Sequence, residues 1–335
     1  MSTNLATQTD PFDMLLRMAG GHAISRCLHV VADLGVADAL EETPRTVAEL
    51  AAATGADPGA LGRVLRLLSA HGIFGKSDGR YGHTPSSRLL REDHPQSMRA
   101  FVQMMGLPVN WKSYEELHYS VRTGLPATGK VTPGGIWKYF AENPEANRVF
   151  NQAMTAKAQG EIAGVMHTYD FSEFRMIGDI GGGRGHLLAA VLAAVPKAKG
   201  VLFDLPHVIE QAANNASERL RLQAGDFFKD DLPVCDAYVM MDIIHDWSDE
   251  DSARILKNLR RAAPVGAKLL LIEAIIPDDT NPNWAKLLDI HMLTLAGGRQ
   301  RTQQEHAELL GNTGFRLERE IAVSGNFSIL EAVSL

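Results

Sequence analysis

Several features are scarce in this sequence, and each scarcity argues against a class of protein. The chain contains two cysteines, Cys27 and Cys235, whose wide separation favours buried thiols over a disulfide and fits a reducing compartment. The longest apolar run, Leu187–Val195, is too short to span a bilayer. The polar segment 1–12 lacks the apolar core of a signal peptide. We therefore expect a cytoplasmic protein without a membrane segment.

Positive charge is not in excess either. The formal net charge of the 335 residues is -7, which favours no polyanionic partner such as nucleic acid. A hydrophobic content of 45% is ordinary for a globular protein, and the length allows two domains. The residue pattern changes at about position 165. We predict a mostly helical domain over residues 1–165 and an α/β domain over residues 166–335.

The front of the chain has the pattern of a winged helix. Residues 12–40 have helical periodicity, with a break expected near Gly20–Gly21. Thr46 and Glu49 form a capping box, and Asp57 followed by proline opens a further helix that ends near position 71. Residues 73–81 are typical of a hairpin.

A winged helix often binds DNA, but the composition of this one disfavours that role. The helix that begins at Pro58 offers only Arg63 and Arg66 to base edges, and the wing adds Lys76 and Arg80. Such a helix is better suited to packing against another chain. Residues 97–163 are mostly helical and rich in aromatic residues and methionine, which suit both core packing and a pocket for a flat organic ligand. The segment 124–135, rich in glycine and proline, is expected to be a loop.

After about residue 165, strands and helices alternate. The candidate strands are 175–180, 200–205, 220–227, 237–244, 268–275 and 327–335. The helices between them start near His186, Pro206, Asp249 and Thr302. This alternation predicts a doubly wound parallel sheet with helices on both faces and a ligand beyond the carboxyl ends of the strands.

A glycine turn follows the first of these strands. Gly181, Gly183 and Gly185 alternate, and they allow positive φ angles and close approach of a ligand. The dinucleotide fingerprint G-x-G-x-x-G fails, because its third glycine would fall on His186, and this disfavours a nicotinamide oxidoreductase. Asp179, two residues before the first glycine, suits a ligand end that bears an amine rather than a pyrophosphate.

Acidic residues end the next two strands. Asp204 ends the second strand, where an acid can accept both hydroxyls of a ribose, although it could instead cap the following helix. Asp226 and Phe227 end the third strand, where they suit an adenine or form a plain turn. Together with the glycine turn, these residues predict a nucleoside ligand without a phosphate.

The fourth strand leads into the segment 242–249, which reads DIIHDWSD. Ser248, Asp249 and Asp251 are expected to cap the next helix. His245 lies where the strand gives way to a loop, on the ligand side of the sheet. Its ordinary pKa is near neutrality, so it is the natural general base for a weakly acidic hydroxyl.

These motifs resemble those of the small-molecule O-methyltransferases of the caffeic acid and hydroxyindole type, which include bacterial antibiotic- and pigment-tailoring enzymes. The matching segments are 179–185, 203–206, 225–227 and 245–249, and the resemblance spans nearly the whole chain. It implies S-adenosylmethionine as methyl donor and a seven-stranded class I methyltransferase sheet. It also implies a homodimer formed through the N-terminal domain.

The resemblance assigns a role to each motif. Asp179, Gly181 and Gly183 would hold the methionine end of the donor, Asp204 the ribose, and Asp226 with Phe227 the adenine. His245 would remove the acceptor's proton. The aromatic residues and methionines between positions 104 and 150 suggest that this acceptor is a planar phenolic compound. C- or N-methyl transfer and a cofactor-sensing regulator are the alternatives, and no metal ligand is predicted.

In this family two acids flank the histidine. Glu273 matches the first of them. The second lies in a Gly-Gly-x-Glu-Arg-Thr segment, which here reads GGRQRT, so Gln300 stands where the family often has glutamate. Met241 likewise replaces a lysine of plant members. The missing second acid removes a charge that would stabilise the imidazolium form of His245.

Overall fold

The computed structural model describes residues 10–323 and 327–335, which fall into two compact units. The first unit comprises the chain up to Pro108 together with Asn143–Lys157. The second comprises Val109–Glu142 and the chain from Ala158 onward. Among the described residues, no helix is long and apolar enough to cross a membrane.

The first unit contains the predicted winged helix. Its elements are α1 (Pro11–Asp33), α2 (Val36–Leu40), β1 (Arg45–Thr46), α3 (Val47–Thr54), α4 (Pro58–Ala70), β2 (Phe74–Ser77), β3 (Arg80–His83), α5 (Pro85–Arg88) and α6 (Arg99–Met105). The three strands pair antiparallel in the order β1-β3-β2. The capping signals act as expected: the Thr46 hydroxyl accepts the N–H of Glu49, and Asp57 accepts the N–H of Ala60 at 2.7 Å.

One prediction in this unit is wrong. α1 runs without a break through Gly20 and Gly21, and the chain turns instead at Gly35, whose φ is 65°. A glycine in a helix interior costs only about 1 kcal/mol relative to alanine, so a long helix tolerates two of them. The left-handed conformation at Gly35 strongly favours glycine, and this is where the helix direction changes.

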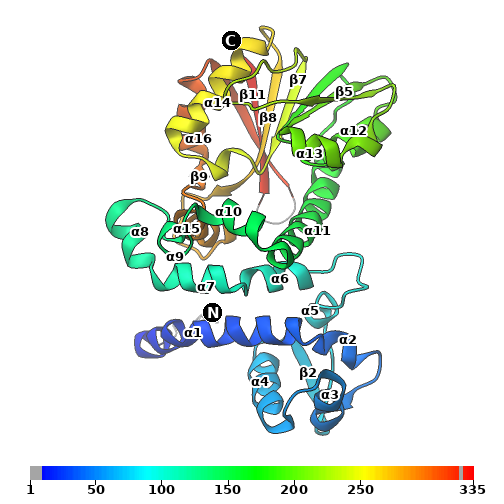
Figure 1. The fold of residues 1–335 in the computed structure, drawn as a ribbon, viewed down its shortest axis with the longest axis vertical. Helices are drawn as coiled ribbons and strands as arrows, with labels where there is room; N and C mark the ends of the chain where they lie inside the picture. Colours follow the sequence, from blue (N-terminus) through cyan, green and yellow to red (C-terminus); the bar gives the residue numbers. More distant parts are fainter. Residues whose placement is uncertain (1–9, 324–326) are drawn as a thin grey trace, which may run out of the picture. The chain divides into compact units, whose positions relative to one another are not determined.

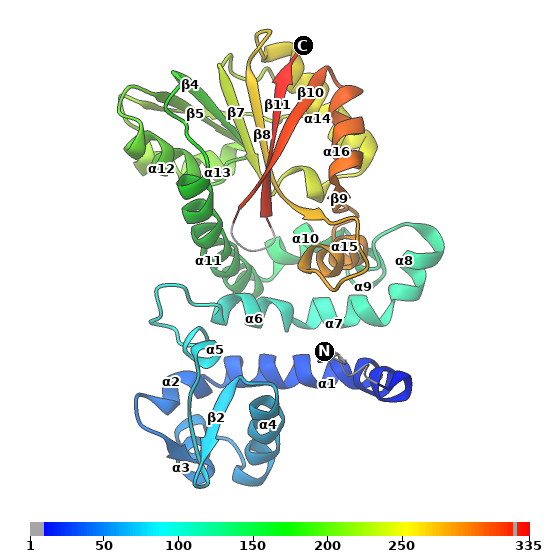
Figure 2. The same ribbon diagram turned by 180° about the vertical axis from the view of Figure 1, so that it is seen from behind.

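The second unit is built on a seven-stranded sheet of order β10-β11-β8-β7-β4-β5-β6 (Figures 1 and 2). The strands are β4 (Met176–Ile180), β5 (Lys199–Asp204), β6 (Leu220–Ala224), β7 (Ala237–Met241), β8 (Lys268–Ile276), β10 (Phe315–Ala322) and β11 (Phe327–Ser334). The first five are parallel, whereas β10 and β11 pair antiparallel with their neighbours. The sheet confirms the predicted α/β fold, with two corrections: it is mixed rather than wholly parallel, and β10 was not among the candidate strands.

Helices pack on both faces of this sheet, as predicted. One face carries α12 (His186–Ala194), α13 (Pro206–Gln211) and the end of α11 (Pro144–Thr168), and the other carries α14 (Asp249–Ala262) and α16 (Gln303–Gly311) (Figure 1). Alternate strand residues feed the two apolar clusters, so that Val239 packs toward α12 and Met240 toward α14. Burying each such side chain stabilises the fold by roughly 1.5–3 kcal/mol. The sheet is therefore a rigid platform for the residues at its ends.

The remaining helices of the second unit lie beyond the end of the sheet where β8 leads toward β9 (Arg301–Thr302) (Figures 1 and 2). They are α7 (Pro108–Glu115), α8 (Leu117–Thr123), α9 (Thr128–Val131), α10 (Gly135–Glu142) and α15 (Trp284–Leu295). α9 interrupts the segment that was expected to be a plain loop. The buried Thr128 hydroxyl donates to the carbonyl of Thr294 at 3.1 Å, which fixes α9 to α15.

Candidate active site

The glycine turn after β4 has the backbone that the sequence predicts. The φ angles of Gly181, Gly183 and Gly185 are 74°, 59° and 75°. A Cβ on Gly181 would lie 2.7 Å from Cδ1 of Ile243 and 3.7 Å from Cε1 of Phe227. The turn is therefore packed closely between the end of β4 and the side chains of Ile243, which follows β7, and Phe227, which follows β6.

Asp179 is buried beneath this turn, with 2% of its surface exposed. Its Oδ2 has no hydrogen-bond partner among the described residues. Burial raises the pKa of Asp179 to about 7, and the nearby charge of Asp204 acts in the same direction. A buried polar atom without a partner costs about 1–3 kcal/mol, so this carboxyl group is suited to a ligand that brings a cationic donor.

Asp204 joins the end of β5 to the same turn. Its Oδ2 accepts the N–H of Gly183 at 2.8 Å, and its Oδ1 accepts the N–H of Leu205 at 2.7 Å. Burial raises the pKa of Asp204, although these two hydrogen bonds oppose the shift. Each carboxylate oxygen keeps a further lone pair for a ligand hydroxyl. The N-cap of α13 is Leu205, so Asp204 does not cap that helix.

The two residues after β6 differ in their surroundings. Asp226 accepts the N–H of Phe228 at 2.9 Å and pairs with Lys229 at 2.9 Å, and the hydrogen bond from Lys229 lowers the pKa of Asp226. These are the contacts of a turn. Phe227 packs edge-on against Trp247, with ring centroids 5.9 Å apart, and reaches Gly181. The structure thus brings the ring of Phe227 to the glycine turn. The carboxylate of Asp226, in contrast, is bound to Phe228 and Lys229 of the turn that follows β6.

His245 lies on η2 (Ile244–Asp246), a single turn that follows β7. Its Nδ1 lies 3.3 Å from Oε2 of Glu273, and its Nε2 lies 3.5 Å from Oδ1 of Asp246. Glu273 is buried at the carboxyl half of β8, and its Oε1 accepts the N–H of Ile244 at 2.8 Å. Burial raises the pKa of Glu273 to about 7, while His245 opposes the shift. Glu273 therefore holds the turn that carries the imidazole, and its Oε2, which has no hydrogen-bond partner among the described residues, faces Nδ1.

A third group approaches the same imidazole. The amide nitrogen of Gln300 lies 2.9 Å from Nδ1 of His245, and the backbone N–H of Gln300 donates to Asp289 at 2.9 Å. The ligand atoms of Asp242, His245 and Glu273 lie within 4.8 Å of one another, a grouping found once in the described part of the chain. Nδ1 of His245 and Oε2 of Glu273 already contact each other, so we interpret these three residues as a histidine flanked by carboxyl groups rather than as a metal site.

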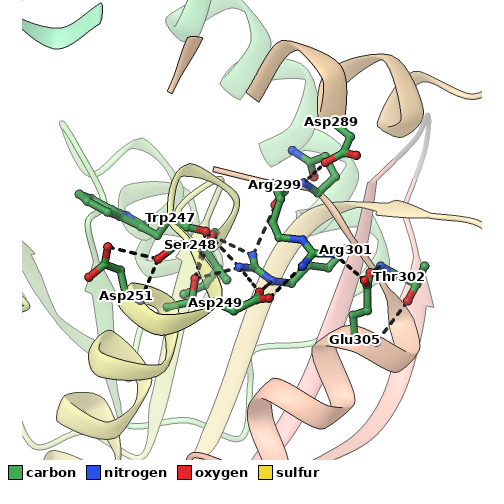
Figure 3. Close-up of polar contacts among 12 residues, drawn as sticks. Trp247, Ser248, Asp249, Asp251, Asp289, Arg299, Arg301, Thr302 and Glu305 are labelled. Atoms are coloured by element: carbon green, nitrogen blue, oxygen red, sulfur yellow. Dashed lines mark hydrogen bonds and ion pairs between the residues drawn. The ribbon is translucent and has the colours of Figure 1, made fainter. Parts of the chain in front are cut away.

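The structure also reveals a residue that the sequence analysis missed. Arg301 is 1% exposed and contacts the His245 turn and the start of α14 (Figure 3). The expected cap is present, since the Ser248 hydroxyl accepts the N–H of Asp251 at 3.1 Å. Asp249, however, pairs with Arg299 and Arg301 at 2.8 Å each. The only signal in the sequence was the position of Arg301 beside Gln300.

Two groups of side chains thus meet at the carboxyl end of the parallel strands. One surrounds the glycine turn and contains two buried or half-buried carboxyl groups and an aromatic ring. The other is an imidazole held by a buried carboxyl group and an amide. Ile243, which contacts Gly181 and precedes η2, links them. A cationic or hydroxyl-bearing ligand can bind the first group beside a base supplied by the second.

Comparison with known proteins gives consistent matches over nearly the whole chain. The model of an O-methyltransferase domain matches residues 114–316, and that of an O-methyltransferase dimerisation domain matches residues 16–93. A phenazine O-methyltransferase of Lysobacter antibioticus is 39% identical over 325 residues, 95% of each chain. An 8-amino-8-demethylriboflavin N,N-dimethyltransferase of Streptomyces davaonensis is 38% identical over 86% of this chain and 85% of that one. The SAH-bound structure of a calicheamicin biosynthesis methyltransferase superposes with a TM-score of 0.90 at 33% identity, over 98% of this chain and 100% of that chain.

Proposed function

Because this chain belongs to the O-methyltransferase family, we propose that it methylates a hydroxyl group of a small aromatic metabolite, with S-adenosylmethionine as donor and His245 as general base. It is an S-adenosylmethionine-dependent methyltransferase, as its match to the O-methyltransferase domain and its SAH-bound structural relative indicate. The observation that carries the finer proposal is the contact between His245 and the buried Glu273.

The residues around the glycine turn fit the donor. The unpartnered Oδ2 of Asp179 can accept a hydrogen bond from the ammonium group of the methionine end, and Gly181 and Gly183 leave their backbone open to it. Asp204 has lone pairs for the ribose hydroxyls, and Asp226 with Phe227 supplies an acceptor and a ring for the adenine. When bound, S-adenosylmethionine supplies an activated methyl group on a sulfonium.

His245 and its partners handle the proton. For Nε2 to accept the acceptor's proton, Nδ1 must already carry one, which it can donate to Glu273. The N–H of Ile244 fixes the Glu273 carboxylate, so the imidazole keeps a defined orientation. Once protonated, His245 is stabilised by the carboxylates of Glu273 and Asp246. General base catalysis typically contributes roughly 10²–10⁴-fold, and positioning of the reactants up to roughly 7–11 kcal/mol.

Two alternatives are less well supported. The riboflavin relative is named as an N,N-dimethyltransferase, and an amine acceptor on this fold would need no strong base. A histidine–carboxylate pair is what a weakly acidic hydroxyl requires, so we favour oxygen. A DNA-binding regulator would need neither the pair of His245 and Glu273 nor its place beside the glycine turn. We also infer a homodimer, because residues 16–93 match a dimerisation domain.

Product analysis tests the proposal. The purified protein is incubated with S-adenosylmethionine carrying a ¹³C-labelled methyl group and with a panel of phenols, aromatic amines and non-acidic arenes. Carbon NMR distinguishes methyl groups on oxygen, nitrogen and carbon. We expect O-methyl products from planar phenols only. Methyl groups on nitrogen or carbon as the main product, or binding of DNA without methyl transfer, would contradict it.

A further inference from the structure

Arg301 contacts the backbone on both sides of His245. Figure 3 shows its side chain beside Trp247 and Asp249. Its Nη1 donates to the carbonyl of Ile244 at 3.1 Å, and its Nη2 donates to the carbonyl of Trp247 at 3.0 Å. Its Nε bonds Asp249 at 2.9 Å, and Nη2 reaches the Ser252 hydroxyl at 3.2 Å. A planar guanidinium presents its donors in a fixed fork, so these contacts fix the ends of η2 relative to the start of α14.

The segment that carries Arg301 also touches His245 directly. The backbone N–H of Arg299 donates to the carbonyl of His245 at 2.9 Å. A Cβ on Gly298 would lie 2.0 Å from that carbonyl oxygen and 2.5 Å from the carbonyl carbon of Asp246. The peptide that follows His245 therefore lies against Gly298, and a larger residue there must displace it.

The same segment is fixed to the strand that bears Glu273. β9 pairs with β8, with Arg301 opposite Ile275 and Thr302 opposite Ile276. Glu273 lies two residues before Ile275 on that strand. The segment 298–302 thus contacts both members of the pair. It pairs with β8, which carries Glu273, and it contacts the turn that carries His245 through Arg299 and Arg301.

We propose that Arg301 is a positioning residue for His245, which it holds through the carbonyl groups of Ile244 and Trp247. This rests on the proposed role of His245 as general base. Arg301 has no place in donor binding, because its contacts are with η2, the start of α14 and its own segment. Its loss should lower turnover while leaving the affinity for S-adenosylmethionine intact.

The test is a double-mutant cycle with Arg301→Lys and His245→Ala. Lysine keeps the charge but cannot reach both carbonyls and Asp249 at once. We expect Arg301→Lys to lower kcat at least tenfold in the wild-type background, with the Kd for S-adenosylmethionine changed less than twofold by calorimetry. In the His245→Ala background the same substitution should change the residual rate less than twofold, because the group it positions is gone.

Arg219→Lys is the matched control. Arg219, which directly precedes β6, also donates to backbone carbonyls through Nη1, including that of Leu192 at 2.8 Å. The hydrogen bonds of this Nη1 are to the end of α12 and the residues that follow it, and not to the His245 turn or the glycine turn. Its substitution should leave kcat within twofold of wild type. If Arg301→Lys does not fold, Gly298→Ala, which displaces the peptide after His245, is used with the same criteria.

The outcomes separate the two proposals. If His245→Ala keeps full activity, the general-base assignment fails, whatever Arg301→Lys does. If His245→Ala is impaired but Arg301→Lys retains wild-type kcat, only the positioning role of Arg301 is overturned. The same holds if Arg301→Lys lowers the rate equally in both backgrounds, or weakens donor binding as much as turnover.

Discussion

The amide nitrogen of Gln300 lies 2.9 Å from Nδ1 of His245. An amide has a donor end and an acceptor end, and the two are distinguished by their hydrogen bonds. In this orientation the nitrogen faces Nδ1, so a neutral imidazole carries its proton on Nε2, and that atom cannot act as a base. Rotation of the amide by 180° brings the oxygen to Nδ1; Gln300 then accepts the Nδ1 proton together with Glu273 and leaves Nε2 free. Gln300 therefore influences which tautomer His245 adopts.

Gln300→Glu should make His245 a stronger base. A second carboxylate beside Nδ1 favours the imidazolium form and can only accept the Nδ1 proton. The acidic limb of the kcat/KM profile should therefore move to higher pH. Gln303→Glu adds the same charge on the exposed start of α16 and should leave the limb in place. An acidic limb that stays in place in Gln300→Glu would contradict a contact between residue 300 and Nδ1 of His245.

Asp204→Ala should weaken donor binding before it affects turnover. It removes a carboxylate suited to the ribose hydroxyls, and a hydrogen bond to a charged group contributes about 1.5–3 kcal/mol. We expect the Kd for S-adenosylmethionine, measured by calorimetry, to rise roughly 10- to 100-fold. Asp236→Ala is the control, because Asp236 also accepts two backbone N–H groups, those of Arg175 and Met176, but at the amino end of β4. Equal losses in both variants would show that a loosened sheet, not a lost ribose contact, is responsible.

Asp179 should make the stability of the free enzyme depend on pH. Burial raises the pKa of Asp179 to about 7, above its ordinary value of 3.8, so the folded state favours the neutral acid. The stability that the neutral carboxyl group of Asp179 contributes is complete below its ordinary pKa of 3.8, and it is lost as the pH rises through the folded-state pKa of about 7. Asp179→Asn stays neutral throughout. Its Tm relative to wild type should therefore rise from pH 5 to 7 and then level off. A constant difference across this range would count against a buried, unpartnered carboxyl group.

Local signals in the sequence predicted many element boundaries. The capping box at Thr46, the N-cap Asp57 and the N-cap Thr302 each mark a helix start, because their side chains satisfy the first free N–H groups. β10 escaped detection for a physical reason. It is an edge strand in which Arg316, Glu318 and other exposed side chains alternate poorly with buried ones. Its place is set by pairing with β11, which no local pattern reports.

The site was predicted in part for the same reason. Acids that end consecutive parallel strands must lie at one edge of a sheet, so Asp179, Asp204 and Asp226 could be grouped from sequence, whereas Glu273 was assigned through the family resemblance. The burial of Arg301 could not be foreseen, because an arginine in a polar segment is usually exposed. The close approach of Gly298 to His245 depends on residues 53 positions apart in the chain, far beyond the window of about 11–18 residues over which periodicity is read.

The most direct test of this account is the turnover of His245→Ala, measured together with its affinity for S-adenosylmethionine. We expect kcat to fall by roughly 10²–10⁴-fold, the usual contribution of a general base, while the Kd of the donor stays within about twofold of wild type. This result would separate deprotonation at His245 from donor binding at Asp179 and Asp204. Full activity in the variant would contradict the central claim that the histidine held by Glu273 removes the acceptor's proton.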